Sequence, residues 1–145
     1  MAIVTGGAVG IGLSAAEGFA RGGAHTVIAD IDEERGSAEA RRLADEGCST
    51  LYSKTNVRDS TEVKEMVEEA MAQYGRMDIL VNNAGGWFGG RTLLEVSEEE
   101  WDEIIDLNLK SVFLCCKAVV PHMMEQRRGR IVSVSSLAGR SAVQP

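Results

Sequence analysis

A glycine-rich turn directly after a short apolar stretch is the feature that most constrains the fold of this chain. Residues 5–12 read Thr-Gly-Gly-Ala-Val-Gly-Ile-Gly and follow the apolar residues 1–4, which is the order of a strand, a turn and a helix. Gly6 permits the tight turn, Gly10 lets phosphate groups approach the backbone, and Gly12 lets the helix pack close to the strand. Free N–H groups and a partial positive charge at the helix start favour an anion. The turn therefore predicts a site for the pyrophosphate of a dinucleotide.

The spacing of these glycines is not decisive by itself. Gly-x-x-x-Gly-x-Gly differs from the more familiar Gly-x-Gly-x-x-Gly, and an ordinary structural turn explains residues 5–12 equally well. The next apolar segment adds context, because residues 26–29 read Thr-Val-Ile-Ala and lead into Asp30. This acid lies about 20 residues beyond the glycines, where a carboxylate that binds a ribose is expected. Asp30 therefore favours the dinucleotide interpretation.

Length, charge and cysteine content narrow the class of protein. The 145 residues fit one domain, and the net charge of -7 argues against nucleic acid or an anionic membrane as the main partner. No apolar run approaches the roughly 18 residues of a membrane span, and the N-terminus has no signal-peptide pattern. Cys48, Cys115 and Cys116 lack the spacing of metal ligands, which favours reduced thiols. We therefore expect a cytoplasmic protein without a metal site.

The apolar patterns alternate between strand and helix along the chain. Strands are expected near residues 2–5, 26–30, 50–54, 78–82 and 130–135, and helices near residues 11–22, 33–46, 60–74 and 98–125. Strands that alternate with helices form a parallel sheet with helices on both faces. The pattern therefore predicts an α/β fold.

The last two predicted helices each carry an apolar stripe. In the helix at 60–74 the stripe consists of Val63, Met66, Val67, Ala70 and Met71. In the helix at 98–125, which follows the capping-box pattern Ser97 to Glu100, it consists of Trp101, Ile104, Ile105, Val112 and Cys116. Asn108 falls within this second stripe, and a buried amide without partners costs roughly 1–3 kcal/mol. Asn108 is therefore either bonded to backbone or kept for function, and the residues alone favour the structural role.

Five features occur in the order found in one family. They are residues 5–12, Asp30, the Asn-Asn-Ala-Gly sequence at 82–85, Asn108, and the Ser-Val-Ser-Ser sequence at 133–136. With them, essentially the whole chain resembles the short-chain dehydrogenase/reductases. The resemblance implies a three-layer Rossmann-type sandwich, with about five parallel strands in the order 3-2-1-4-5.

The resemblance also implies a set of coenzyme-binding residues: Thr5, Gly6, Gly10, Ile11, Gly12, Asp30, Ile31, Asn56, Val57, Asn82, Ala84 and Gly85. Asp30 would accept hydrogen bonds from both hydroxyls of the adenosine ribose. Asn56 stands where the family usually has an aspartate beside the adenine, and we expect it to accept from the adenine amino group. Asn82, Ala84 and Gly85 would stabilise the central sheet and line the coenzyme cleft.

Two further positions match the family's catalytic residues. Asn108 matches the active-site asparagine that helps to hold a proton-relay water, so the resemblance gives its expected buried position a functional explanation. Ser136 matches the catalytic serine that donates a hydrogen bond to the substrate oxygen. Gly6, Asp30, Asn82 and Ser136 lie at or just past the ends of predicted strands, and ligands of such folds bind beyond the carboxyl ends of the strands.

The residues around Asp30 predict NAD rather than NADP as the coenzyme. A carboxylate at Asp30 would face the 2′-phosphate of NADP, and two like charges ~4 Å apart at an effective dielectric of ~20 repel by at most about 4 kcal/mol. The family's phosphate-binding variants often carry a basic residue where this chain has Val9 or Ile31. Asp32, Glu33 and Glu34 place more negative charge nearby, as their order in the sequence shows.

One part of the family's catalytic pattern is missing from the chain. The proton donor is a tyrosine about a dozen residues after the serine, followed four residues later by a lysine, and residues 137–145 contain neither. We therefore expect residues 1–145 to be a single NAD-binding Rossmann domain, truncated at its C-terminus and inactive alone. The strand at 130–135 would then form an unpaired edge, and such edges favour association. The full-length protein is expected to be a homotetramer or homodimer.

The expected function is the NAD-dependent interconversion of a secondary alcohol and a ketone, with a small-molecule substrate. One alternative is a nucleotide-binding or interaction protein without catalytic activity. Another is a different Rossmann enzyme such as a methyltransferase, in which Asp30 would also hold an adenosine ribose. The turn at 82–85 and the serines after the fifth strand argue against a methyltransferase.

Overall fold

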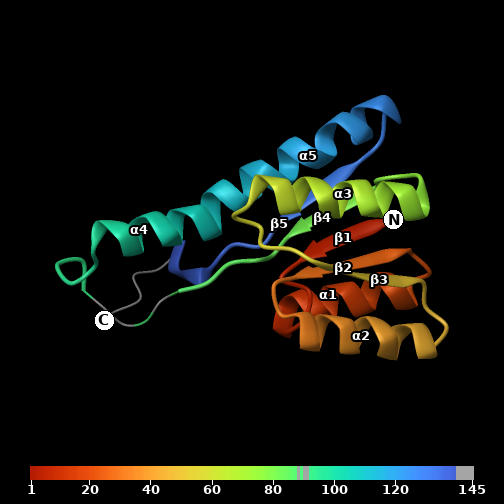
Figure 1. Ribbon diagram of the computed structural model, residues 1–145, viewed down its shortest axis with the longest axis horizontal. Helices are drawn as coiled ribbons and strands as arrows, with labels where there is room; N and C mark the ends of the chain where they lie inside the picture. Colours follow the sequence, from red (N-terminus) through yellow and green to blue (C-terminus); the bar gives the residue numbers. More distant parts are fainter. Residues whose placement is uncertain (88, 90–91, 140–145) are drawn as a thin grey trace.

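Five parallel strands form one sheet in the order β3-β2-β1-β4-β5, as seen in the computed structural model, which describes residues 1–87, 89 and 92–139 (Figure 1). The strands are β1 (Ala2–Thr5), β2 (Thr26–Asp30), β3 (Thr50–Lys54), β4 (Ile79–Asn82) and β5 (Arg130–Ser133). Every neighbouring pair is parallel. The predicted strand order and the α/β class are therefore confirmed. Residues 140–145 of the predicted domain lie outside the described residues.

Helices cover both faces of the sheet and give three layers. The helices are α1 (Gly10–Arg21), α2 (Glu33–Asp45), α3 (Ser60–Tyr74), α4 (Glu98–Ile105) and α5 (Ser111–Glu125). Figure 1 shows α1 and α2 on one face of the sheet and α3 and α5 on the other, while α4 extends beyond the sheet. This arrangement confirms the three-layer Rossmann-type sandwich.

Alternation of side chains along β1 divides the core between the two faces. Ile3 belongs to the cluster that contains Val63 of α3 and Val119 of α5. Its neighbour Val4 belongs to the cluster on the other face, with Leu43 of α2. Successive strand residues point to opposite faces, so β1 supports both helix layers at once. The stripe predicted for α3 packs as expected, with Val63, Met66, Val67 and Ala70 buried and Met71 partly buried.

The prediction of one uninterrupted helix over 98–125 is wrong in its middle. A π-helical turn at Asp106–Lys110 separates α4 from α5. The predicted capping box does open α4, because Glu100 N donates to Ser97 Oγ at 3.2 Å and Ser97 N donates to Glu100 Oε2 at 3.1 Å. A turn with an extra residue shifts the helix phase by about 100°. Residues on either side of 106–110 therefore do not form one continuous stripe.

The predicted burial around Asn108 is also wrong. Asn108 is exposed, and Trp101 at the start of the expected stripe is 54% exposed. Ile104 and Ile105 are half-buried, since α4 projects beyond the sheet and has little to pack against in the described part of the chain (Figure 1). Only the continuation in α5, where Cys115 and Val119 are buried, packs on the sheet.

The thiols differ in burial. Cys115 is buried and Cys48 and Cys116 are half-buried, and all three are free. Burial, together with the neighbouring Cys116, raises the pKa of the Cys115 thiol to about 12. Cys115 is therefore protonated at neutral pH and serves as an apolar packing residue. Within the described ranges, no helix combines the length and the apolar character that a membrane span requires.

The sheet ends at an exposed strand. β5 stops at Ser133, two residues earlier than predicted, although Val134 N still donates to Asn82 O at 2.9 Å. Ile131, Val132 and Val134 are 41%, 50% and 41% exposed. Within the described residues, β5 pairs only with β4. An exposed, apolar edge of this kind is a template for pairing with another chain.

We expect the 145-residue chain to self-associate through β5. Its apparent mass in light scattering should rise with concentration, because edge pairing satisfies free backbone groups and buries apolar side chains. Val132→Lys should reduce the association, since a charge on an edge strand opposes pairing. A concentration-independent monomer with a sharp, reversible thermal transition would contradict this prediction.

Candidate functional site

A hollow of about 660 Å³ lies at the carboxyl ends of the central strands. Its lining comes from the loops after β1, β2, β3 and β4 and from the helix segment 98–110, and consists of Gly6, Val9, Gly10, Ile11, Asp30, Ile31, Thr55, Asn56, Val57, Arg58, Asn83, Ala84, Gly85, Glu103 and Leu107. Most of the coenzyme residues implied by the sequence are thus together. Thr5 and Gly12, which were predicted to form the turn, do not line the hollow, and neither does Asn82, which was predicted to line it.

The glycine turn and the start of α1 form one wall of the hollow. Gly6 and Gly10 have φ values of 61° and 56°, in the left-handed region that favours glycine. Val9 occupies the N-cap of α1 and makes no side-chain hydrogen bond to the helix. The first N–H groups of α1 therefore have no side-chain cap and can donate to an anion.

Gly12 is needed for a close approach between backbone segments. A Cβ at this position would lie 2.1 Å from Gly6 O and 2.4 Å from Asn83 Nδ2. The sequence predicted an approach of the helix to the strand, whereas the structure shows that α1 approaches the turn and the loop after β4. Gly12 is therefore a support of the turn and not part of the lining.

Thr5 and Asn83 join the ends of β1 and β4. Asn83 Nδ2 donates to Thr5 O and Gly6 O, both at 3.0 Å. Thr5 Oγ1 accepts from the backbone N–H groups of Asn83 and Ala84, both at 3.1 Å, and donates to Val81 O at 3.3 Å. These bonds fix the turn against the neighbouring loop, which gives Thr5 a bracing role.

The two asparagines at the end of β4, Asn82 in the strand and Asn83 directly after it, point in different directions. Asn82 Nδ2 lies 3.5 Å from both Cys116 Sγ and Ser133 Oγ, between the sheet and α5. Asn82 Oδ1 is buried and has no hydrogen-bond partner in the described part of the chain. Asn83, which the sequence prediction omitted, is the one that reaches the turn. The alternation of side chains at a strand end was the available signal, since two adjacent residues cannot both face the same side.

Asp30 is held at the end of β2 by four hydrogen bonds. Its carboxylate accepts from Ala8 N at 2.9 Å and from Asp32 N at 3.0 Å. Its backbone carbonyl accepts from Thr55 N at 3.0 Å and from the hydroxyl of Tyr52 at 2.9 Å. The carboxylate is therefore fixed against the glycine turn before any ligand binds.

Burial is the main reason that the pKa of Tyr52 is raised to about 12, and the charges of Glu33, Asp30 and Asp32 add to it. The phenol consequently stays protonated at neutral pH. The phenol therefore keeps the proton that it donates to the Asp30 carbonyl.

The charges around Asp30 are predominantly negative or neutralised. Lys54 Nζ pairs with Glu33 at 2.9 Å, and Arg35 lies 3.5 Å from Asp32. Val9 and Ile31, at the rim of the hollow, are 48% and 60% exposed and uncharged. Near Asp30 the lining therefore has little unpaired positive charge, apart from Arg58 in the loop after β3.

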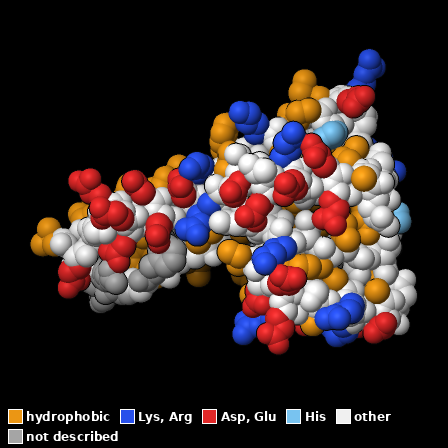
Figure 2. Space-filling model, in the orientation of Figure 1, with side chains coloured by type: hydrophobic (Ala, Val, Ile, Leu, Met, Phe, Trp, Pro, Cys, Tyr) orange, Lys and Arg blue, Asp and Glu red, His pale blue; other side chains and the backbone are white. Residues whose placement is uncertain are grey.

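An acidic surface adjoins the other end of the hollow. Figure 2 shows acidic side chains gathered over α4, whose sequence includes Glu98, Glu99, Glu100, Asp102 and Glu103. A second, smaller recess shares Asn56, Arg58 and Glu103 with the main hollow and is also lined by Asp59, Asp102 and Asp106. Arg58 thus lies between the hollow and this acidic surface.

Asn108 holds the loop after β4 against the π-helical turn. Its Oδ1 accepts from Gly86 N at 3.1 Å, and its Nδ2 donates to Gly86 O at 3.0 Å and to Ile104 O at 2.9 Å. A Cβ on Gly85 would lie 2.8 Å from Asn108 Oδ1. The amide is thus bonded to backbone, as the residues alone favoured, although it is not buried.

Ser136 lies beyond the end of β5 and outside the hollow. It is exposed, and its Oγ accepts from Ala138 N at 3.2 Å. Within the described residues no hydrogen bond joins Ser136 to Asn108. The two predicted catalytic residues are therefore not linked by a hydrogen bond in the described part of the chain.

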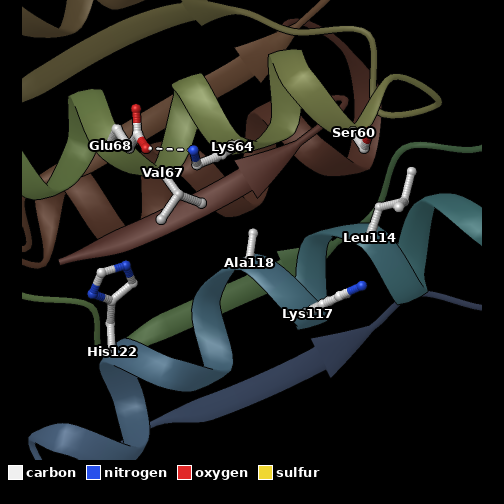
Figure 3. A pocket seen from close by; sticks show the side chains of 8 residues that line it. All are labelled: Ser60, Lys64, Val67, Glu68, Leu114, Lys117, Ala118 and His122. Atoms are coloured by element: carbon white, nitrogen blue, oxygen red, sulfur yellow. Dashed lines mark ion pairs between the residues drawn. The ribbon is translucent and has the colours of Figure 1, made fainter.

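A separate hollow of about 340 Å³ lies between α3 and α5 (Figure 3). Lys64 pairs with Glu68 at 3.3 Å on α3, and α5 contributes Lys117 and His122. Leu114, Ala118 and Val67 provide apolar lining. It contains no residue from a strand end and none of the predicted site residues.

Comparison with known proteins gives consistent matches over almost the whole chain. The family described as short chain dehydrogenase matches residues 1–144. The chain is 41% identical over 139 residues to the 3-oxoacyl-[acyl-carrier-protein] reductase FabG of Chlamydia muridarum, and 41% identical over 138 residues to the (2S)-[(R)-hydroxy(phenyl)methyl]succinyl-CoA dehydrogenase subunit BbsD of Thauera aromatica. Each match covers 95% of this chain.

A solved structure agrees with the fold. The crystal structure of gox2181 superimposes with a TM-score of 0.95 at 35% identity and covers 99% of this chain and 56% of that chain. The two curated relatives are covered over 56% and 55% of their lengths. The chain therefore spans about half the length of the curated relatives that it matches.

Proposed function

This chain belongs to the short chain dehydrogenase family, a family of oxidoreductases, and we propose that it binds NAD(H). In this proposal it is the coenzyme-binding part of an enzyme that interconverts a secondary alcohol and a ketone. The observation that carries the proposal is the Asp30 carboxylate, held against the glycine turn by Ala8 N–H at 2.9 Å. A carboxylate in that place can accept from the two hydroxyls of an adenosine ribose, as in other folds of this class.

The residues of the hollow fit the rest of a dinucleotide. The uncapped start of α1 supplies N–H donors for the pyrophosphate. A Cβ placed on Gly10 would meet no atom within 4 Å, so this part of the turn is open to a ligand. Ala84 and Gly85, which line the hollow after β4, have small side chains and leave room for the ligand. The sequence signals for phosphate and ribose thus refer to one continuous hollow.

The charge distribution supports NAD over NADP. A 2′-phosphate beside Asp30 would meet a like charge, and the neighbouring cations Lys54 and Arg35 are already paired with acids. Like charges ~4 Å apart in a medium with an effective dielectric of ~20 repel by at most about 4 kcal/mol. The free hydroxyl of NAD would instead donate to the carboxylate.

The roles proposed for the catalytic residues concern the substrate side. A bound nicotinamide supplies or accepts the hydride. The exposed hydroxyl of Ser136 would donate to the substrate oxygen. Asn108, which also fixes the loop at Gly86, would help to hold a proton-relay water. For the whole protein we propose one coenzyme-binding domain and a homodimer or homotetramer.

The names of the relatives support the alcohol–ketone chemistry. One is a reductase of a 3-oxoacyl group on a carrier protein, and the other is a dehydrogenase of a hydroxy-substituted succinyl-CoA. An oxo group reduced in one case and a hydroxyl oxidised in the other are the two sides of the same reaction. We extend this reaction type, and not the particular substrates, to the present chain.

Calorimetric titration with NADH, NADPH and S-adenosylmethionine tests the proposal. We expect saturable heat with NADH, weaker binding of NADPH and no competition by S-adenosylmethionine, because the hollow joins a ribose-binding carboxylate to a turn suited to a pyrophosphate. NADPH binding as tight as NADH binding would contradict the coenzyme preference. Absence of binding by both nicotinamide coenzymes would contradict the proposed function itself.

A further inference from the structure

The groove between α3 and α5 is a second hollow that the proposed coenzyme site does not use. Its volume of about 340 Å³ is within the range of pockets that hold small molecules. The two helices lie side by side on one face of the sheet (Figure 1). Among the described residues, none lines both this groove and the larger hollow at the strand ends. A ligand in the groove would therefore leave the coenzyme hollow open.

The floor of the groove is aliphatic. Val67 of α3 is buried, and Leu114 and Ala118 are half-buried and one helical turn apart on α5. Figure 3 shows the side chains of Val67 and Ala118 pointing into the space between the two helices. Because alanine ends at a methyl group, this level of the groove has room for an aliphatic chain, and burial of such a chain is favourable.

Donors without a partner lie at one end of the groove. Figure 3 shows Ser60 and Lys117 at this end and His122 at the other. In the part of the chain that the structure describes, neither the Ser60 hydroxyl nor the Lys117 ammonium forms a hydrogen bond or an ion pair. Lys117 Nζ lies 5.6 Å from the centroid of the Phe113 ring, a contact that leaves its N–H groups able to donate. This end can therefore bind an anion.

The acids near the groove determine where an anion can bind and how much charge it can carry. Glu68 lies at the opposite end from Ser60 (Figure 3), and its carboxylate is 3.3 Å from Lys64 Nζ. Asp59 does not line the groove, and its carboxylate accepts from Thr61 N at 2.7 Å. With Lys64 paired, the lysine of α5 supplies the excess positive charge of the lining. That single charge matches a monoanion, and a second negative charge on the ligand would be uncompensated.

We propose that the groove binds a medium-chain aliphatic carboxylate. The carboxylate accepts from Lys117 and Ser60, and the chain lies on Val67 and Ala118 and points toward the end with Glu68. The groove has both parts that such a ligand requires, an aliphatic floor and an unpaired cation, in a chain whose net charge is -7. Because the two hollows share no described residue, this inference does not rest on the proposed function.

Calorimetric titration of the 145-residue chain with hexanoate, octanoate and decanoate at constant ionic strength tests the proposal. We expect saturable binding that tightens by up to about fourfold for each added methylene group, because each group is buried on the floor. 1-Octanol, which has the same chain without the charge, should bind more weakly than octanoate. NADH should not displace octanoate.

Three variants separate the head from the chain of the ligand. Lys117→Gln should weaken octanoate binding by about threefold to fivefold, the usual effect of losing an exposed charge pair, and leave 1-octanol binding unchanged. Ala118→Leu fills the floor and should weaken both ligands by about tenfold or more. Arg128→Gln is the matched control, because it removes the same charge from an exposed residue that does not line the groove, and it should leave octanoate binding unchanged.

Thermal melting checks the folding of each variant. If Ala118→Leu does not fold, the chain-length series and the exposed Lys117→Gln still decide the question. The proposal is overturned if octanoate does not bind, if the affinity does not depend on chain length, or if Arg128→Gln weakens octanoate as much as Lys117→Gln does. Displacement of octanoate by NADH would place the ligand in the coenzyme hollow and would overturn it as well.

Discussion

Replacement of Gly12 by alanine is expected to remove measurable NADH binding and to destabilise the chain, whereas alanine at Gly18 in the same helix should do neither. A Cβ at Gly12 would lie 2.1 Å from Gly6 O and 2.4 Å from Asn83 Nδ2. Gly6 O is backbone, so the clash cannot be relieved by a rotamer change. The glycine turn and α1 have to move apart.

The same movement would break the contacts that shape the hollow. Asn83 Nδ2 bonds to both Thr5 O and Gly6 O at 3.0 Å, and it lies in the path of the added methyl group. We expect a loss of stability of about 1–3 kcal/mol from overpacking. The dissociation constant for NADH should rise by about 100-fold or more, since every 1.4 kcal/mol lost is about tenfold in affinity.

Gly18 provides the control within α1. A Cβ there would meet no atom within 4 Å, and the residue is exposed. Gly18→Ala should therefore stabilise the chain by about 0.5–1 kcal/mol, the usual effect of replacing a helical glycine, and leave NADH affinity unchanged. Urea unfolding and calorimetry measure both quantities. NADH affinity within threefold of the unmodified chain in Gly12→Ala would show that the turn is not the coenzyme cradle.

The sequence predicted the sheet well because the strands have strong local signals. The segments at 2–5 and 26–29 are buried, and the glycines and Asp residues beside them mark the turns and helix starts. Such signals are local, so they do not depend on distant parts of the chain. The boundaries of α3 could be predicted to the residue, because Asp59 caps its start and Gly75, with φ of 67°, ends it.

The prediction failed where a residue's environment depends on distant contacts. Helical periodicity placed Asn108 in a buried stripe, but periodicity cannot register the π-helical turn at Asp106–Lys110 or the projection of α4 beyond the sheet. Likewise, residue type alone does not distinguish Asn82 from Asn83, although the alternation of side chains implies that only one of the two amides reaches the turn. That choice depends on the strand phase at Thr5, whose hydroxyl accepts from Asn83 N and Ala84 N.

Asn56 shows a similar limit at the level of one hydrogen bond. It lines the hollow together with Asp30 and Gly10, two other residues of the predicted coenzyme site. The direction in which its amide points is determined by Arg58, two residues later, whose N–H needs an acceptor. Donor and acceptor roles of a side chain therefore follow from local backbone geometry that residue type alone does not specify.

Replacement of Asp30 by asparagine is expected to reduce the preference for NADH over NADPH by at least about tenfold. NADH should bind more weakly, and the electrostatic repulsion of the NADPH 2′-phosphate should be smaller. The amide retains the shape of the carboxylate but loses its charge. It also places an N–H group opposite Ala8 N or Asp32 N, both of which now donate to Asp30. Hydrogen bonds to a charged group contribute about 1.5–3 kcal/mol each, so the loss of one ribose contact is enough for the effect.

Glu34→Gln is the control that separates the effect of a direct contact at Asp30 from the effect of the chain's overall negative charge. Glu34 is an exposed acid in the first turn of α2, four residues from Asp30, and its replacement removes the same single charge. It has no part in the lining of the hollow, so this water-exposed charge should change the coenzyme ratio less than threefold. Dissociation constants of NADH and NADPH for the unmodified chain and both variants give the comparison directly. Equal changes in the ratio for Asp30→Asn and Glu34→Gln would mean that overall charge, and not a carboxylate at the ribose, determines the coenzyme, and the assignment of Asp30 would have to be abandoned.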